Sequence, residues 1–183
     1  LNLIQKNPEI AANPSQIDVI KITAYEPAFG IIGDPAKRNP KTRQSADHSM
    51  VYIVSTMLRK AEEIVKSDGV DFFAQSNDEV WKRIMLTPYD FDEGAINNET
   101  TRAIMETIYF EHGGEEFDKK YPDGIPTSVR ITMKDGAVFD SGLVMYPSGH
   151  ARNNECNLED ILQSKFEMHG QIAMDNPKEI IKR

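Results

Sequence analysis

Four cations of an otherwise acidic chain lie within seven residues, immediately before a predicted helix: Lys37, Arg38, Lys41 and Arg43. Asp47 and His48 follow them at the expected helix start, and Tyr52 comes four residues, about one helical turn, after His48. A helix N-terminus carries unpaired N–H groups and a partial positive charge, so nearby cations strengthen its attraction for an anion. The pattern predicts a site for a carboxylate-rich ligand.

The roles within this site follow from the residue types. A histidine beside a carboxylate and several cations suits a general acid or base, and an arginine fork suits a carboxylate. We therefore predict that the catalytic residues are His48, Asp47 and Tyr52. The predicted substrate-binding residues are Lys41, Arg43 and Ser49. Two simpler interpretations remain open: His48 caps the helix or bonds a carbonyl, and the cations keep a proline-bearing loop solvated.

A second candidate segment is Tyr146–His150 (YPSGH), followed by Arg152. His150 and Arg152 either face a ligand or belong to a structural turn, and Pro147 and Gly149 are typical turn residues. Zinc-ligand spacings, a P-loop, GxGxxG and GxSxG are all missing from the sequence. A single cysteine cannot hold an iron–sulfur cluster. The prediction is chemistry with no cofactor and no metal.

Composition limits the class of protein. The chain has 183 residues, which suits one domain or one domain with an appended helix. Its single Cys156 excludes an internal disulfide and fits either a reducing compartment or a chain that merely lacks cysteine. No apolar run approaches the ~18 residues of a membrane span, so no such span is expected, and no signal peptide is recognisable. A pI near 5.0 argues against nucleic-acid binding, which needs a basic face.

Hydrophobic periodicity predicts an α+β fold in the order β-α-α-β-β-α, in which an antiparallel sheet packs against helices. The expected strands are 17–25, 127–133 and 137–145, the last two joined by the Asp135-Gly136 turn. The expected helices are 46–66 with Ser45 as N-cap, 77–85, 98–110 and 158–172, with a last fragment from Asn176. Residues 29–32 are expected as loop or short strand. The predicted division is an N-terminal extension or helical remnant (1–16), the α+β domain (17–172) and a helical tail (173–183).

Four short sequence motifs, in this order, resemble the MmgE/PrpD family: GDPAK from Gly33, DHSMVYI from Asp47, KDG from Lys134 and YPSGH from Tyr146. The family includes 2-methylcitrate dehydratase, cis-aconitate decarboxylase and iminodisuccinate epimerase. The resemblance covers about residues 17–170 and implies a cofactor-free lyase for a tricarboxylate. It also implies an active site between a large helical domain and this smaller C-terminal α+β domain. On this resemblance the cleft is faced by Lys41, Arg43, Asp47, His48 and Tyr52.

The GDP-to-DHS-x-x-Y block looks most like 2-methylcitrate dehydratase. The resemblance therefore implies a hydro-lyase of propionate catabolism that is cytoplasmic, homodimeric and inactive without the helical domain. One segment departs from the family: many members carry several arginines after YPxGH, where this chain reads Ala151-Arg152-Asn153-Asn154-Glu155. The alternatives are another family activity, or a carboxylate-binding or interaction module without catalysis.

Overall fold

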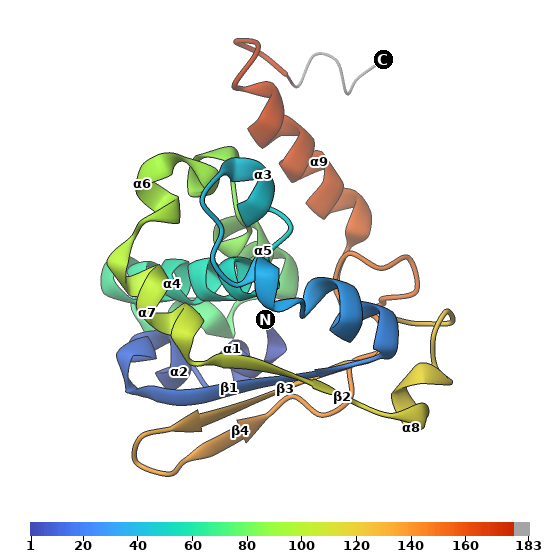
Figure 1. Ribbon diagram of the computed structural model, residues 1–183. Helices are drawn as coiled ribbons and strands as arrows, with labels where there is room; N and C mark the ends of the chain where they lie inside the picture. The colour runs from blue at the N-terminus through green and yellow to red at the C-terminus, as the bar shows by residue number, and fades with distance from the viewer. Residues whose placement is uncertain (178–183) are drawn as a thin grey trace.

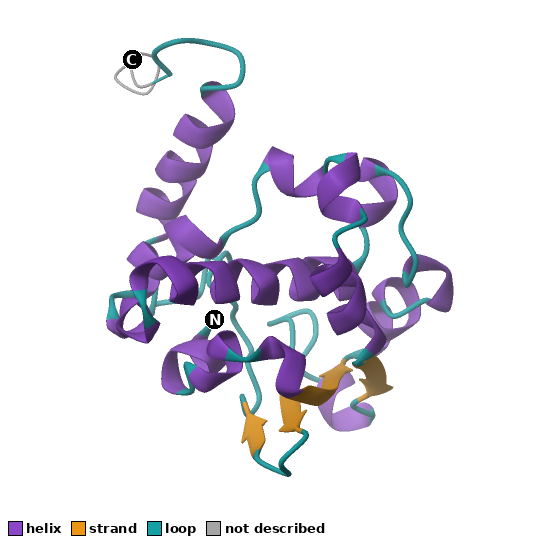
Figure 2. Ribbon diagram, turned by 90° about the vertical axis from the view of Figure 1, so that its left-hand side faces the viewer, coloured by secondary structure: helices purple, strands orange, loops and turns teal. Residues whose placement is uncertain are grey.

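The computed structural model describes residues 1–177 (Figures 1 and 2). The α-helices are α1 (Asn2–Lys6), α2 (Glu9–Ala12), α3 (Arg43–Ala46), α4 (Met50–Asp68), α5 (Asn77–Ile84), α6 (Glu93–Ile96), α7 (Glu99–Glu106), α8 (Glu115–Asp118) and α9 (Leu158–Gly170). The strands are β1 (Ile17–Ala24), β2 (Ile108–His112), β3 (Thr127–Met133) and β4 (Val138–Asp140). The predicted helical fragment that begins at Asn176 falls almost entirely outside the described residues.

The four strands form one sheet in the order β2-β1-β3-β4. β1 pairs antiparallel with β3, where Ile20 lies opposite Ile131, and β3 pairs antiparallel with β4. The apolar side chains of β1 turn toward the core, and Ile20 is fully buried. The predicted α+β class, with a largely antiparallel sheet packed against helices, is thus confirmed.

One strand was not predicted. The segment 98–110 was expected as a single helix, but α7 ends at Glu106 and the chain continues as β2, which pairs in parallel with β1. The change occurs at Thr107, whose carbonyl accepts a hydrogen bond from the Ile20 N–H at 2.9 Å. Ile108 then lies opposite Ile20 and is buried. Pairing with β1 therefore outweighs the local helical pattern, as expected for a β-branched and aromatic run.

The long helix starts later than predicted. Ser45 is not its N-cap: Ser45 lies within the separate one-turn helix α3, which Thr42 caps. The N-cap of α4 is Ser49, whose Oγ accepts a hydrogen bond from the Tyr52 N–H. At the other end, α4 stops at Gly69, where a φ of 80° favours glycine.

Two further segments differ from the predictions. Residues Ala28–Ile32 form a short π-helical turn rather than a loop or strand. The second strand of the hairpin was predicted over 137–145 but is regular only over Val138–Asp140. Gly142, with a φ of 65°, interrupts it, and Val144 then forms an isolated β-bridge with Thr127. The predicted Asp135-Gly136 turn is present, and Gly136 has a φ of 90°.

The core lies between the sheet and α4, with α1 and α2 between them (Figures 1 and 2). Ile4 of α1 and Ile10 of α2 are buried in the same cluster as Leu58 and Ile20, so residues 1–16 pack as part of this body. Helix α9 leads away from it in both views and packs against α5. No helix of the described residues is long and apolar enough to cross a membrane.

Candidate functional site

The cationic segment between β1 and α4 divides into two pairs of side chains. Lys37 and Arg38 bind backbone: the Lys37 ammonium donates to the Ile31 carbonyl at 2.6 Å. The Arg38 guanidinium donates to the Ile108 carbonyl at 2.6 Å, at the start of β2. These two cations fasten the loop to neighbouring elements and are not free for a ligand.

The other two cations, Lys41 and Arg43, are exposed. Neither side chain has an ion pair or hydrogen bond within residues 1–177. Their backbone is nevertheless held, because the Ser45 hydroxyl accepts from the Lys41 and Thr42 N–H groups at 3.0 and 2.9 Å. Two unpaired cations on an ordered turn are available to an anion from outside.

Asp47 and His48 form a pair on the same turn. The His48 Nδ1 lies 2.5 Å from an Asp47 carboxylate oxygen and 2.9 Å from the Gln44 carbonyl. The histidine side chain is 74% exposed. The Gln44 carbonyl, followed by the Asp47 carboxylate, raises the pKa of His48 above its usual value, while Lys37 opposes the shift. This pair, with Lys41 and Arg43, is called the 41–48 surface below.

Ser49 and Tyr52, by contrast, lie in the interior and are both fully buried. The Ser49 hydroxyl donates to the Lys37 carbonyl at 2.6 Å and caps α4. The Tyr52 hydroxyl donates to the Asp90 carbonyl, and burial raises the pKa of Tyr52. The structure therefore brings Lys41, Arg43, Asp47 and His48 to the surface and gives Ser49 and Tyr52 internal partners.

This arrangement also changes the expected source of the anion site. The N-terminal turn of α4 is covered, since Ser49, Val51 and Tyr52 are all buried. Helix α3 has four residues and one turn. Attraction for an anion at the 41–48 surface therefore depends on the side-chain charges of Lys41 and Arg43.

The side chains of the YPSGH segment and of Arg152 contact this segment itself and a neighbouring loop. His150 Nδ1 accepts from the Arg152 N–H at 3.1 Å, and its ring lies 5.0 Å from that of Tyr146. The Arg152 guanidinium donates to the Asp123 carbonyl at 3.0 Å. These contacts agree with the alternative of a structural turn for this segment.

Sequence reasoning missed a buried charge cluster around Asp90. Its carboxylate accepts from the Lys60 ammonium at 2.6 Å and from the Thr87 N–H at 2.7 Å, and the Arg59 guanidinium lies 3.4 Å away. The Thr87-x-x-Asp90 spacing of a capping box was the available signal. The cluster ties the 85–92 loop to α4.

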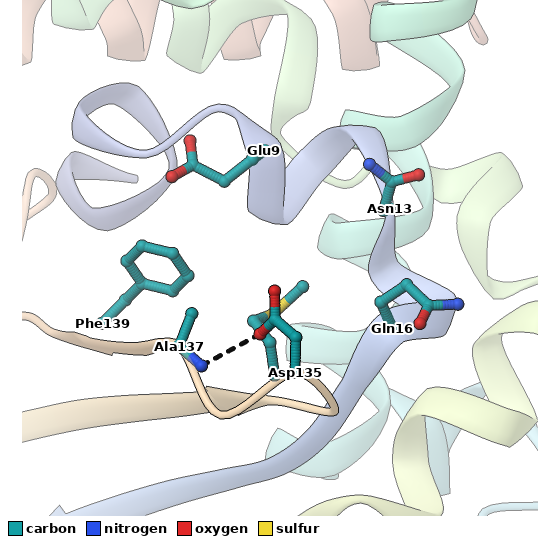
Figure 3. Close-up of a pocket in the computed structure, with 7 residues that line it drawn as sticks. Glu9, Asn13, Gln16, Asp135, Ala137 and Phe139 are labelled. Carbon is teal, nitrogen blue, oxygen red and sulfur yellow. Dashed lines mark hydrogen bonds between the residues drawn. The ribbon is translucent and has the colours of Figure 1, made fainter.

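Two cavities lie elsewhere. A cavity of about 270 Å³ is lined by Glu9, Asn13 and Gln16 on one side and by the β3–β4 turn on the other (Figure 3). A larger groove of about 750 Å³ is lined by α1, by Met50, Val54 and Met57 of α4 and by residues of β1 and β3. Neither cavity is lined by a residue of the 41–48 surface. The described residues contain no group of three or more His, Cys, Asp or Glu that is arranged for a metal ion.

Fold and surface together define a small α+β domain that presents free cations and an oriented histidine on an exposed turn. The chain belongs to the MmgE/PrpD family: the family model described as the MmgE/PrpD C-terminal domain matches residues 2–84 and 80–182. Comparison with individually curated proteins found no significant match.

Proposed function

We propose that this chain is the C-terminal domain of a cofactor-free hydro-lyase, most like 2-methylcitrate dehydratase, which eliminates water from a tricarboxylate. The observation that carries the proposal is the 41–48 surface, where Lys41 and Arg43 stand unpaired beside the oriented Asp47–His48 pair. The cations bind substrate carboxylates, and His48 transfers a proton. Family membership supports the same class of enzyme.

Water elimination needs more than this surface provides. A base must remove the proton next to a carboxylate, and an acid must protonate the departing hydroxide. Cations must also stabilise the charge that develops on the substrate. On the 41–48 surface, His48 is the one group suited to proton transfer near neutral pH. The proposal therefore includes a helical domain that precedes this one, supplies the second proton-transfer group and closes the site.

The proposal is tested with the complete product of the gene and with the 183-residue chain alone. Water elimination from 2-methylcitrate is followed by the ultraviolet absorbance of the unsaturated product. We expect activity from the complete product and none from the chain alone. Decarboxylation of cis-aconitate and epimerisation of iminodisuccinate, assayed in parallel, decide among the activities within the family.

Variants of the complete enzyme test the 41–48 surface. His48→Ala is expected to lower kcat by about 10²–10⁴-fold, the usual contribution of a general acid or base. Arg43→Ala is expected chiefly to raise KM, because it removes binding that substrate and transition state share. Lys119→Ala, at an exposed lysine paired with Glu115, is the control and should leave both constants unchanged. Near-wild-type kinetics for both site variants would contradict the assigned roles.

The second candidate is a carboxylate-binding or interaction module without catalysis. The burial of Tyr52 favours it, because this removes one predicted proton-transfer group from the ligand's reach. If the chain is such a module, the complete gene product should bind tricarboxylates in calorimetry and catalyse none of the three reactions. Measured binding should then weaken in the Arg43→Ala variant.

A further inference from the structure

His48 is held at one ring nitrogen and open at the other. Nδ1 lies within hydrogen-bond distance of two acceptors, the Gln44 carbonyl at 2.9 Å and the Asp47 carboxylate at 2.5 Å. Nε2 has no partner within residues 1–177, and the side chain is 74% exposed. The two nitrogens of this ring therefore have opposite environments.

Two acceptors at one nitrogen determine where the proton of a neutral imidazole resides. A carbonyl and a carboxylate both repel a nitrogen lone pair and both attract an N–H donor. The neutral ring must then carry its proton on Nδ1, which leaves the lone pair on Nε2. This hydrogen-bond arrangement sets both the tautomer and the orientation of a histidine.

We infer that Asp47 is a positioning residue: together with the Gln44 carbonyl it holds His48 in the Nδ1–H form, so that Nε2 is the atom that exchanges a proton with the ligand. The inference rests on the proposed function for the identity of that ligand, a tricarboxylate. The tautomer and its cause can be tested without it.

Asp47 also sets the charge of the ring. Among the charged groups that act on His48, Asp47 favours the imidazolium and Lys37 opposes it. The Lys37 ammonium donates to the Ile31 carbonyl, whereas the Asp47 carboxylate touches the ring directly. Removing the Asp47 charge should therefore lower the pKa of His48.

The chain contains an internal reference for the tautomer. His150 has the opposite arrangement, because its Nδ1 accepts from the Arg152 N–H at 3.1 Å and so carries the lone pair. Its neutral form should have the proton on Nε2. One protein thus offers both tautomers under the same conditions.

The experiment is long-range ¹H–¹⁵N NMR of the 183-residue chain across a pH titration, with each histidine assigned by substitution. Above its pKa, His48 should show a protonated Nδ1 and an unprotonated Nε2, and His150 the reverse. Asp47→Asn should shift the His48 titration to lower pH, whereas Asp47→Glu should preserve more of it. Asp135→Asn, in the hairpin turn, is the matched control and should leave the titration unchanged.

Two results would overturn the inference: an unprotonated Nδ1 on neutral His48, or a His48 titration that Asp47→Asn does not move. In the complete enzyme, Asp47→Asn should shift the His48 limb of the kcat/KM pH profile to lower pH. His48→Ala with unchanged turnover would refute the proposed function of this surface, and the NMR result would still decide the tautomer. The two failures are therefore distinguishable.

Discussion

Asp90 shows how a single buried side chain stabilises this domain. The Asp90 side chain is 11% exposed and that of Lys60 13%, and the two groups are 2.6 Å apart. Burial alone would raise the pKa of Asp90, but the Lys60 ammonium and the Thr87 N–H outweigh it and hold the pKa below its usual range. The carboxylate is therefore bound more favourably in the folded protein than its protonated form.

Asp90→Asn should lower the free energy of unfolding by about 3 kcal/mol at pH 7, because it leaves the Lys60 charge buried without its counter-ion. In the wild type, the folded pKa of Asp90 lies below the unfolded one. Its stabilisation is thus complete above the unfolded value near 4 and is lost as the pH falls through the lower folded value. Urea unfolding at a series of pH values should show that the free energies of unfolding of the wild type and Asp90→Asn become more similar in acid. A difference between these free energies that stays constant from pH 7 to pH 3 would contradict this.

The Tyr52→Phe substitution tests whether the Tyr52 hydroxyl has a structural or a catalytic role. The change removes the hydrogen bond from the hydroxyl to the Asp90 carbonyl and should cost about 1 kcal/mol of stability. Tyr89→Phe, at an exposed ring, is the control and should cost nothing measurable. If Tyr52→Phe abolishes turnover of the complete enzyme at unchanged stability, then the hydroxyl reaches the substrate after all.

At the scale of elements, the start of α4 depends on Ser49. Ser49→Ala removes the N-cap and also leaves the Lys37 carbonyl without the hydroxyl that donates to it. The expected loss is about 1–2 kcal/mol in the free energy of unfolding. Ser45→Ala removes hydrogen bonds to the exposed backbone of Lys41 and Thr42 and should cost less. The reverse order in chemical denaturation would show that the helix begins at the predicted position near Ser45.

At the scale of the whole molecule, α9 is joined to the body less extensively than α4. Ile161 is its buried residue, Lys82 bonds to Asp160 at 2.7 Å, and Leu162 and Phe166 are 54% and 44% exposed. Hydrogen exchange should therefore find α9 amides opening locally, while α4 amides exchange only through global unfolding. Equal protection of the two helices would contradict the weak attachment. Raising the protein concentration serves as a control for association through α9.

A large part of this fold was predictable from local sequence patterns. The alternation of Ile17–Ala24, the Asp135-Gly136 turn and the apolar stripe of α4 each depend on neighbours in sequence, so the corresponding elements were predictable. Where a long-range partner decided the outcome, local patterns misled. Thr107 ends α7 because the Ile20 N–H bonds its carbonyl, and Ser49 caps α4 because the Lys37 loop lies over it.

The same division holds for the candidate site. The sequence by itself identified the cations and the Asp47–His48 pair, since charge and spacing are properties of the chain. Only the tertiary structure decided which of them are free. Backbone carbonyls of Ile31 and Ile108 engage Lys37 and Arg38, whereas Lys41 and Arg43 have no such partner within residues 1–177. Tyr52 lies one turn beyond His48 but inside the core, because burial depends on what packs against a helix as well as on its periodicity.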